Sequence, residues 1–291
     1  MSLLTGIGKP LYLRNHQITI QCMYSFKSII YIFKNSLFFE QVISGICGIW
    51  CIFLRLYTNM KTIAVLTAMP QELDAVLKIF NFANLEKIEI FGMSVYISVH
   101  NGIKFILALS GVGRVNTAMN TTLITREFKP DEIINVGSAG GLQNEQKILD
   151  IVIPNEIVAV DVDLTALGCE YGQMLGDQKS YFADAKIQEK LINSGKGLAT
   201  VHTGVIGSSE AFICREEQVQ NIRNRFNNGV VCVEMEAYSI AVVCSRFNIP
   251  FAIIRSLSDV PAHGEGNEHD FNAFLDKASD NAAKLLYRYA Q

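Results

Sequence analysis

The chain has 291 residues, of which 49% are hydrophobic and 18% charged, and its formal net charge at pH 7 is −3. This composition is typical of a globular protein with a packed core and excludes a disordered chain. A slightly acidic chain lacks the excess of basic residues that nucleic-acid binding needs. We therefore expect no nucleic-acid partner.

The chain contains seven scattered cysteines and five histidines. The cysteines form no paired metal motif, and no two histidines lie at metal-ligand spacing, so we predict no metal. Scattered cysteines in odd number are typical of buried thiols in a reduced protein. This pattern predicts a cytoplasmic location.

The first 59 residues differ from the rest of the chain. The segment from Tyr24 to Tyr57 is rich in Ile, Phe, Tyr and Cys, but its longest uncharged run, Gln41 to Leu54, is shorter than the roughly 20 residues that span a bilayer. No small-residue cleavage site of a signal peptide follows it cleanly. We predict that Met60 is the natural start and that residues 1–59 are a mis-assigned or added apolar extension; the alternative is an interfacial or partner-binding segment.

From Met60 onward, apolar runs alternate with segments of helical period, which is typical of an α/β fold and predicts one domain over residues 60–291, with no membrane contact expected for it. In chain order we expect a strand at 62–66, a helix at 72–80, strands at 89–99 and 104–109 joined by an Asn101-Gly102 turn, a helix at 115–127, strands at 132–136, 201–206 and 230–233, a helix at 236–247, a strand at 251–255 and a helix at 271–289.

Two glycine clusters follow expected strands. Gly137 to Gly141 is interpreted as a turn that ends the strand at 132–136 and lets a ligand approach the backbone closely. Gly111-Val112-Gly113 lacks the third glycine of a dinucleotide fingerprint, so it supports NAD binding only weakly. We expect no cofactor.

Three carboxylates stand just past apolar runs, where open α/β sheets present their ligand-binding edge. Asp259, at the end of a buried strand, would have a raised pKa and act as a general acid, or it would cap a turn. Glu236 either compensates a helix dipole or binds a ribose cis-diol with its two oxygens. Strand alternation points Glu234 to the other side, as a supporting acid. For Glu72, the sequence alone favours an exposed position in the first helical turn.

The order and spacing of these segments resemble those of the 5′-methylthioadenosine/S-adenosylhomocysteine nucleosidases of the nucleoside phosphorylase superfamily. The resemblance extends from Met60 to about Tyr289 and rests on the segments 68–72, 135–142, 163–173, 233–237 and 255–259. It implies a three-layer αβα sandwich with a central mixed β-sheet. It also implies hydrolysis of the N-glycosidic bond of these nucleosides with release of adenine, by a homodimer whose only partners in the reaction are the nucleoside and water.

The resemblance also assigns the acid and base roles. It implies that Asp259 protonates the adenine ring nitrogen at position seven and that Ser258 orients it. It implies that Glu72, with Ser138 and Arg255, holds and polarises the attacking water.

The remaining roles concern binding. By the same resemblance, Glu236 binds the 2′ and 3′ hydroxyls and Met235 packs against the sugar face. Phe212 stacks on adenine, and the Ile213 backbone reads its Watson–Crick edge. The other predicted substrate-binding residues are Ala139 and Gly140, in the floor of the ribose and water site, and Phe271.

Two other functions stay open from the sequence. A phosphorolytic nucleoside phosphorylase would need a basic phosphate-binding residue; Arg114 is a candidate, although we interpret it as structural. A non-catalytic nucleoside-binding module is the other alternative, disfavoured by the three intact carboxylates. Leu167 and Cys169 stand where aromatics are common in the family, and the segment 261–270 is about two residues longer than usual. Because both regions are expected near the 5′ substituent, its identity is not predicted.

Overall fold

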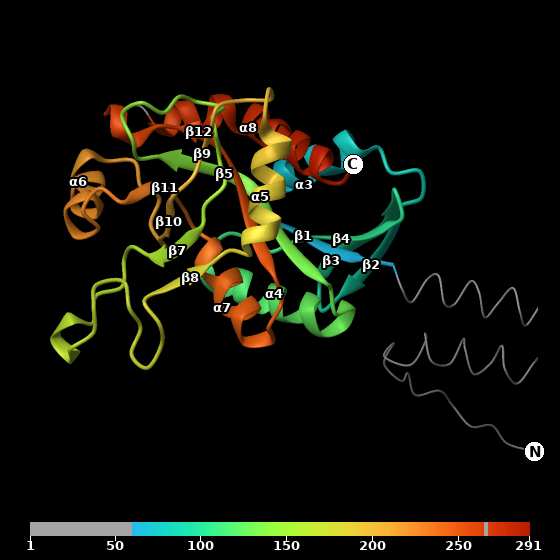
Figure 1. The fold of residues 1–291 in the computed structure, drawn as a ribbon, viewed down its shortest axis with the longest axis horizontal. Helices are drawn as coiled ribbons and strands as arrows, with labels where there is room; N and C mark the ends of the chain where they lie inside the picture. Colours follow the sequence, from blue (N-terminus) through green and yellow to red (C-terminus); the bar gives the residue numbers. More distant parts are fainter. Residues whose placement is uncertain (1–59, 265–266) are drawn as a thin grey trace, which may run out of the picture. The chain divides into compact units, whose positions relative to one another are not determined.

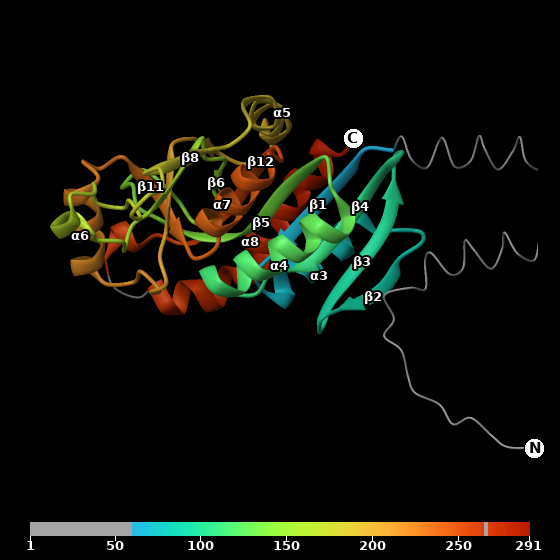
Figure 2. The same cartoon turned by 90° about the horizontal axis from the view of Figure 1, so that it is seen from below.

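The structure is a computed structural model that describes residues 60–264 and 267–291. The expected extension, residues 1–59, therefore lies outside the described residues. None of the helices in the described part is both long and apolar enough to cross a membrane. Figure 1 shows the described chain as a sheet with helices on both faces, and Figure 2 gives the view at right angles.

The predicted strands and helices are present, and the described chain has five further elements within residues 151–225, three short strands and two helices. The strands are β1 (Thr62–Thr67), β2 (Glu86–Ile90), β3 (Met93–His100), β4 (Ile103–Leu109), β5 (Glu132–Gly141), β6 (Ile151–Val152), β7 (Glu156–Ala159), β8 (Ser180–Phe182), β9 (Val201–His202), β10 (Val205–Ser208), β11 (Val230–Glu234) and β12 (Phe251–Asp259). The helices are α3 (Pro70–Phe80), α4 (Arg114–Phe128), α5 (Ala185–Gly195), α6 (Glu216–Arg225), α7 (Ala237–Phe247) and α8 (Asn267–Tyr289), with short 3₁₀ turns at Thr165–Leu167 and Pro261–His263.

Strand β1 shows why the fold has three layers. Its side chains alternate between the two faces of the sheet. Ile63 and Val65 pack into a core with α3, α5 and α8, whereas Ala64 and Leu66 pack into a second core with α4 and α7. Both faces of the sheet are thus covered by helices, which confirms the predicted αβα sandwich.

The sheet is mixed, in the order β2-β3-β4-β1-β5-β11-β10-β7-β8, with β12 paired to β5 and β6. Strand β5 lies at its centre. Along one edge it pairs with β12 in parallel from Ile133 to Gly140. Along the other edge it pairs first with β1, in parallel as far as Asn135, and then with β11, antiparallel at Gly140 and Gly141. The carboxyl ends of β1 and β11 therefore run toward each other and leave residues 136–139 of β5 without a strand partner on that edge.

Three expected strands differ from the structure. The run 89–99 is divided into β2 and β3, because Phe91 (φ 48°) and Gly92 (φ 81°) make a two-residue hairpin turn. The run 201–206 is divided into β9 and β10 at Gly204, which has φ 141°. The strand at 132–136 does not end in a turn at Gly137 but continues as β5 to Gly141.

Candidate active site

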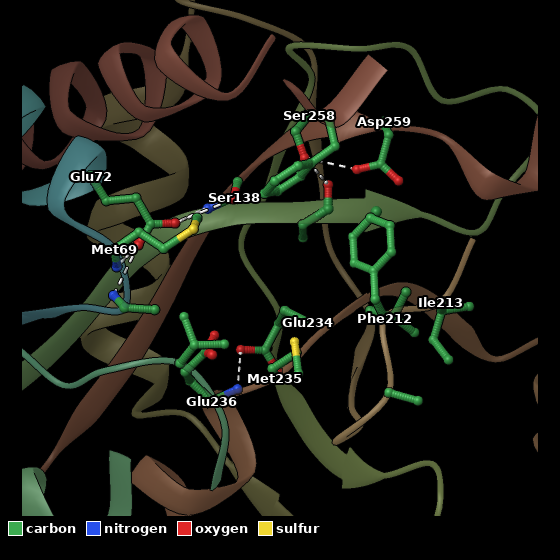
Figure 3. Close-up of a pocket in the computed structure, with 17 residues that line it drawn as sticks. Met69, Glu72, Ser138, Phe212, Ile213, Glu234, Met235, Glu236, Ser258 and Asp259 are labelled. Carbon is green, nitrogen blue, oxygen red and sulfur yellow. Dashed lines mark hydrogen bonds between the residues drawn. The ribbon is translucent and has the colours of Figure 1, made fainter. Parts of the chain in front are cut away.

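A pocket with an empty volume of about 630 Å³, including its open mouth, lies over the unpaired stretch of β5 (Figure 3). Volumes of this size suit small-molecule ligands. Every predicted site residue except Arg255 lines it. The lining residues are Ala68, Met69, Glu72, Val112, Ser138, Ala139, Gly140, Ala211, Phe212, Ile213, Val233, Glu234, Met235, Glu236, Ser258, Asp259 and Phe271.

Glu72 lies in the first turn of α3 and is buried rather than exposed. Its Oε2 accepts the N–H groups of Ala68 (2.9 Å) and Met69 (3.1 Å), and its Oε1 accepts the N–H (2.9 Å) and hydroxyl (3.2 Å) of Ser138. Burial raises its pKa, against the Arg255 charge and these N–H donors. Each hydrogen bond from an N–H group favours the charged form, so these donors oppose the effect of burial and support Glu72 as a carboxylate.

A close approach of backbone and side chain makes room for Glu72. A Cβ on Gly137 would lie 2.6 Å from Glu72 Oε1. The glycine in β5 thus permits the carboxylate to reach the Ser138 N–H at the unpaired edge. The predicted close approach to the backbone is present at Gly137. The group that approaches is the Glu72 side chain instead of a ligand, and Gly137 lies in an extended strand instead of a turn.

Asp259 ends β12 and has a different environment. Its Oδ1 accepts the Ser258 hydroxyl at 2.8 Å, while its buried Oδ2 has no hydrogen-bond partner among the described residues. Burial raises the pKa of Asp259 to about 7, against the Ser258 hydrogen bond and with a contribution from the Asp270 charge. At neutral pH this carboxyl can therefore carry a proton on an oxygen that nothing else occupies.

Glu234, Glu236 and Arg255 form a buried cluster beside Glu72. Arg255 Nη2 lies 2.6 Å from Glu234 Oε2 and 3.8 Å from Glu236 Oε2. Glu236 precedes α7, and its Oε1 accepts the Gly113 N–H at 3.0 Å. Burial and then the Glu234 charge raise the pKa of Glu236 to about 8, against Arg255 and the Gly113 N–H.

The structure corrects one predicted orientation and places one predicted residue behind the pocket wall. Arg255 does not line the pocket, but its charge acts on Glu72 from behind the wall, where it also donates to the Ile254 carbonyl (3.2 Å) and to Asn135. Glu234 was expected to point away, yet it lines the pocket. The reason is that Glu234 ends β11, and its Oε2 turns back to accept N–H groups at the start of α7.

Aromatic side chains form the wall next to Asp259. The rings of Phe212 and Phe271 meet edge to face, with centroids 5.5 Å apart. Asn267, at the start of α8, donates to the Cys214 carbonyl at 3.2 Å and so joins α8 to the segment that carries Phe212 and Ile213. This wall offers a flat ring and the Ile213 backbone to a ligand.

No lysine, arginine or histidine is among the described residues that line the pocket. Arg114, the candidate for phosphate, bonds Asp161 at 2.7 Å and Glu210 at 3.2 Å. Leu167 and Cys169 are also absent from the lining. Within the ranges 60–264 and 267–291, no group of three or more His, Cys, Asp or Glu residues is placed to hold a metal.

The sequence reasoning did not predict Ala68, Met69, Val112, Ala211 and Val233 as lining residues. Four of them lie within four positions of a predicted residue, so sequence proximity would have found them. Val112 lies apart, between glycines with φ 77° and 86°. That glycine pair was the available signal, because it marks backbone that a bulkier residue would not fit.

Comparison with known proteins gives consistent matches. The sequence model of the Phosphorylase superfamily matches residues 62–291. The 5′-methylthioadenosine/S-adenosylhomocysteine nucleosidase of Oceanobacillus iheyensis is 38% identical over 226 residues, which are 77% of this chain and 96% of that protein.

Solved structures match over the same part of the chain. The nucleosidase of the same name from Neisseria meningitidis, in complex with methylthio-immucillin-A, has a TM-score of 0.74 at 38% identity and covers 79% of this chain and 98% of its own. The futalosine hydrolase of Helicobacter pylori has a TM-score of 0.75 at 27% identity and covers 79% and 97%. The described fold is therefore shared by hydrolases of different nucleosides.

Proposed function

The chain belongs to the Phosphorylase superfamily, and we propose that it hydrolyses the N-glycosidic bond of 5′-methylthioadenosine and S-adenosylhomocysteine and releases adenine. Two relatives that match this chain over 96% and 95% of their own length are named 5′-methylthioadenosine/S-adenosylhomocysteine nucleosidases. The pocket has matching chemistry. We call Asp259, Phe212, Ile213 and Phe271 its base end, and Glu72, Ser138 and Glu236 its sugar end.

In the proposed reaction, Asp259 donates its proton from Oδ2 to a ring nitrogen of adenine as the bond between the base and the anomeric carbon breaks. The electron pair of that bond leaves with the base. A water held by Glu72 then attacks the anomeric carbon and gives its proton to Glu72. To reach Glu72, the water replaces the Ser138 hydroxyl, which makes the longest of the four contacts. This division of roles parallels inverting glycoside hydrolysis.

The transition state of this reaction has positive charge on the sugar. Glu72, Glu234 and Glu236 surround the sugar end, and Arg255 lies behind them as their cation. A pocket with an excess of carboxylates favours a cationic sugar over a neutral one, which is the differential binding that lowers a barrier.

Hydrolysis is favoured over phosphorolysis by one observation: the described lining of the pocket holds carboxylates and no cationic side chain. Phosphate beside Glu72 would meet negative charge. The two nearby arginines are engaged, Arg114 with Asp161 and Glu210, and Arg255 with Glu234.

The test is adenine release from 5′-methylthioadenosine by the purified full chain, with and without phosphate. We expect equal rates and free 5-methylthioribose as the sugar product. Release that needs phosphate and yields 5-methylthioribose 1-phosphate would establish the phosphorylase instead. Adenosylhomocysteine, 5′-deoxyadenosine, aminofutalosine and inosine in the same assay identify the preferred 5′ group and base. Tight binding of an adenosine analogue without turnover of any substrate would establish a binding module.

We also propose a cytoplasmic homodimer with residues 60–291 as its catalytic unit. On and just before α4, Val112, Val115 and Met119 are 45%, 81% and 55% exposed. Apolar side chains this exposed and this close together are typical of a protein interface. Sedimentation analysis tests the dimer, and substitution of Val115 and Met119 by polar residues should weaken it.

A further inference from the structure

Three buried carboxylates share one guanidinium at the sugar end. Glu72, Glu234 and Glu236 are each less than a tenth exposed. Within the described chain, the ion pairs of this cluster are those of Arg255, at 2.6 Å from Glu234 and 3.8 Å from Glu236. Three ionised carboxylates against one cation would leave an excess of buried negative charge, which a proton on one of them relieves.

The hydrogen bonds distinguish which carboxylate holds that proton. Glu234 accepts from Arg255, from the N–H groups of Glu236 (2.9 Å) and Ala237 (2.8 Å), and from the Ser208 hydroxyl. Glu236 accepts one hydrogen bond, from the Gly113 N–H. Donors stabilise the charged form, so Glu234 is the ionised partner and Glu236 is the one with room for a proton.

We propose that Glu234 is a positioning residue that keeps Glu236 protonated in the empty pocket, so that a ribose cis-diol binds with release of one proton from Glu236. The inference rests on the proposed nucleoside function of the pocket and adds a proton to its binding step. The Glu236 O–H bond breaks, the proton passes to solvent, and the carboxylate then accepts both hydroxyls of the diol.

The groups that face Glu236 come from four elements. They are Glu234 of β11, Arg255 of β12, Glu72 of α3 and the Gly113 N–H at the start of α4. Burial and the Glu234 charge raise the pKa of Glu236 to about 8, and the Glu72 charge adds to this. The two donors, Arg255 and Gly113, act in the opposite direction.

The experiment is titration calorimetry of the full chain with a non-hydrolysable C-nucleoside analogue of 5′-methylthioadenosine and with its 2′,3′-dideoxy counterpart. Each titration is run in buffers of low and high ionisation enthalpy, which gives the number of protons released. The difference between the two ligands isolates the diol, because Asp259 meets the same base in both. We expect the diol-bearing ligand to release more protons than its dideoxy counterpart at pH 7, and we expect this difference to shrink at pH 9, above the pKa of about 8.

Variants distinguish a role of Glu234 in setting the protonation of Glu236 from a purely structural role. Glu234→Gln should abolish the extra proton, because Arg255 then pairs with Glu236 and keeps it ionised; Glu234→Asp, which keeps the charge, should restore it. Glu236→Gln should also abolish it. Asp74→Asn, on the exposed side of α3, is the control that should change nothing.

Equal proton release by the two ligands at pH 7 would overturn the inference, and this comparison needs no variant to fold. If the diol-bearing analogue binds without extra proton release, nucleosidase function survives and only the proton coupling fails. If that analogue does not bind at all, the proposed function fails and the inference fails with it.

Discussion

The base end and the sugar end of the pocket each hold a deeply buried acid, but the two acids have different surroundings. Glu72 is 3% exposed and accepts four hydrogen bonds, three of them from backbone N–H groups. Asp259 is 1% exposed and accepts one hydrogen bond, from Ser258. Equal burial therefore does not give equal chemistry. The number of fixed donors separates a carboxylate held as a base from a carboxyl free to carry a proton.

The largest expected effect comes from a substitution that alters the sugar end alone. Glu72→Gln should reduce hydrolysis by about 10⁴-fold, the upper range for a proton-transfer group, because it removes the base and turns an amide NH₂ toward backbone donors. Binding of an adenine analogue should change little, because the base end is intact. Turnover and analogue affinity measure the two effects. Asp74→Asn on the same helix is the matched control, and a loss of activity there would implicate the helix instead of the carboxylate.

The second substitution alters the base end alone. Asp259→Asn should lower turnover by about 10²–10⁴-fold, because an amide cannot donate a proton to the leaving base. Substrate affinity should stay close to that of the unaltered protein. Adenine release measured by absorbance gives both quantities, with Asp276→Asn, on the exposed side of α8, as the control. Near-normal turnover in the Asp259 variant would rule out this carboxyl as the general acid.

A change in the substrate tests the sugar end without altering the protein. Removal of the 2′ hydroxyl should cost about 1–3 kcal/mol in kcat/KM, because Glu236 then lacks a donor in a desolvated site. This corresponds to roughly 5–150-fold. The ratio of kcat/KM for the ribo and 2′-deoxy substrates measures it. Equal values would mean that Glu236 does not bind the diol.

The pH dependence of kcat/KM should separate the two ends. Glu236 acts as a carboxylate, so activity should rise about tenfold per unit below pH 7, and Asp259 acts as an acid, so activity should fall about tenfold per unit above pH 8. Between these limits the two changes offset each other. Glu236→Gln should remove the rising limb and Asp259→Asn the falling limb. A profile that keeps both limbs in these variants would assign the titrations to other groups.

The smallest expected effect concerns residues outside both ends. A chain that starts at Met60 should keep its kcat/KM, because every residue of the pocket follows Met60. Its solubility should improve, since the apolar segment 24–57 is removed. Sedimentation and turnover of the shortened and full chains make the comparison. An insoluble or inactive shortened chain, beside an active full chain, would make residues 1–59 part of the working protein.

Features that depend on local pattern could be predicted from the sequence. The apolar runs located β1, β11 and β12, and they placed Asp259 and Glu236 at strand ends. Apolar periodicity also located the helices α3, α7 and α8. Short strands such as β7 and β8 carry too few residues for a period to stand out, and their pairing across the sheet defines them.

Features that depend on pairing were not predictable. Glycines disfavour strands, so Gly137 to Gly141 indicated a turn, but pairing with β12 and β11 holds them in β5. The orientation of Glu234 follows from the start of α7, and the position of Arg255 follows from Glu234. Neither can be deduced from alternation along a single strand.

The glycines of β5 have a consequence for how this protein can change by mutation. A Cβ at Gly137 would lie 2.6 Å from Glu72 Oε1, and one at Gly140 would lie 3.1 Å from Asp259 Oδ2. Alanine at Gly137 would therefore conflict with Glu72, and alanine at Gly140 with Asp259 and Pro261, so neither glycine can be replaced freely while its acid stays. The two pairs are units of epistasis: alanine at Gly137 becomes tolerable only after Glu72 is shortened, when its reaction is already lost. Sequence drift should accordingly spare these glycines as long as selection keeps the acids.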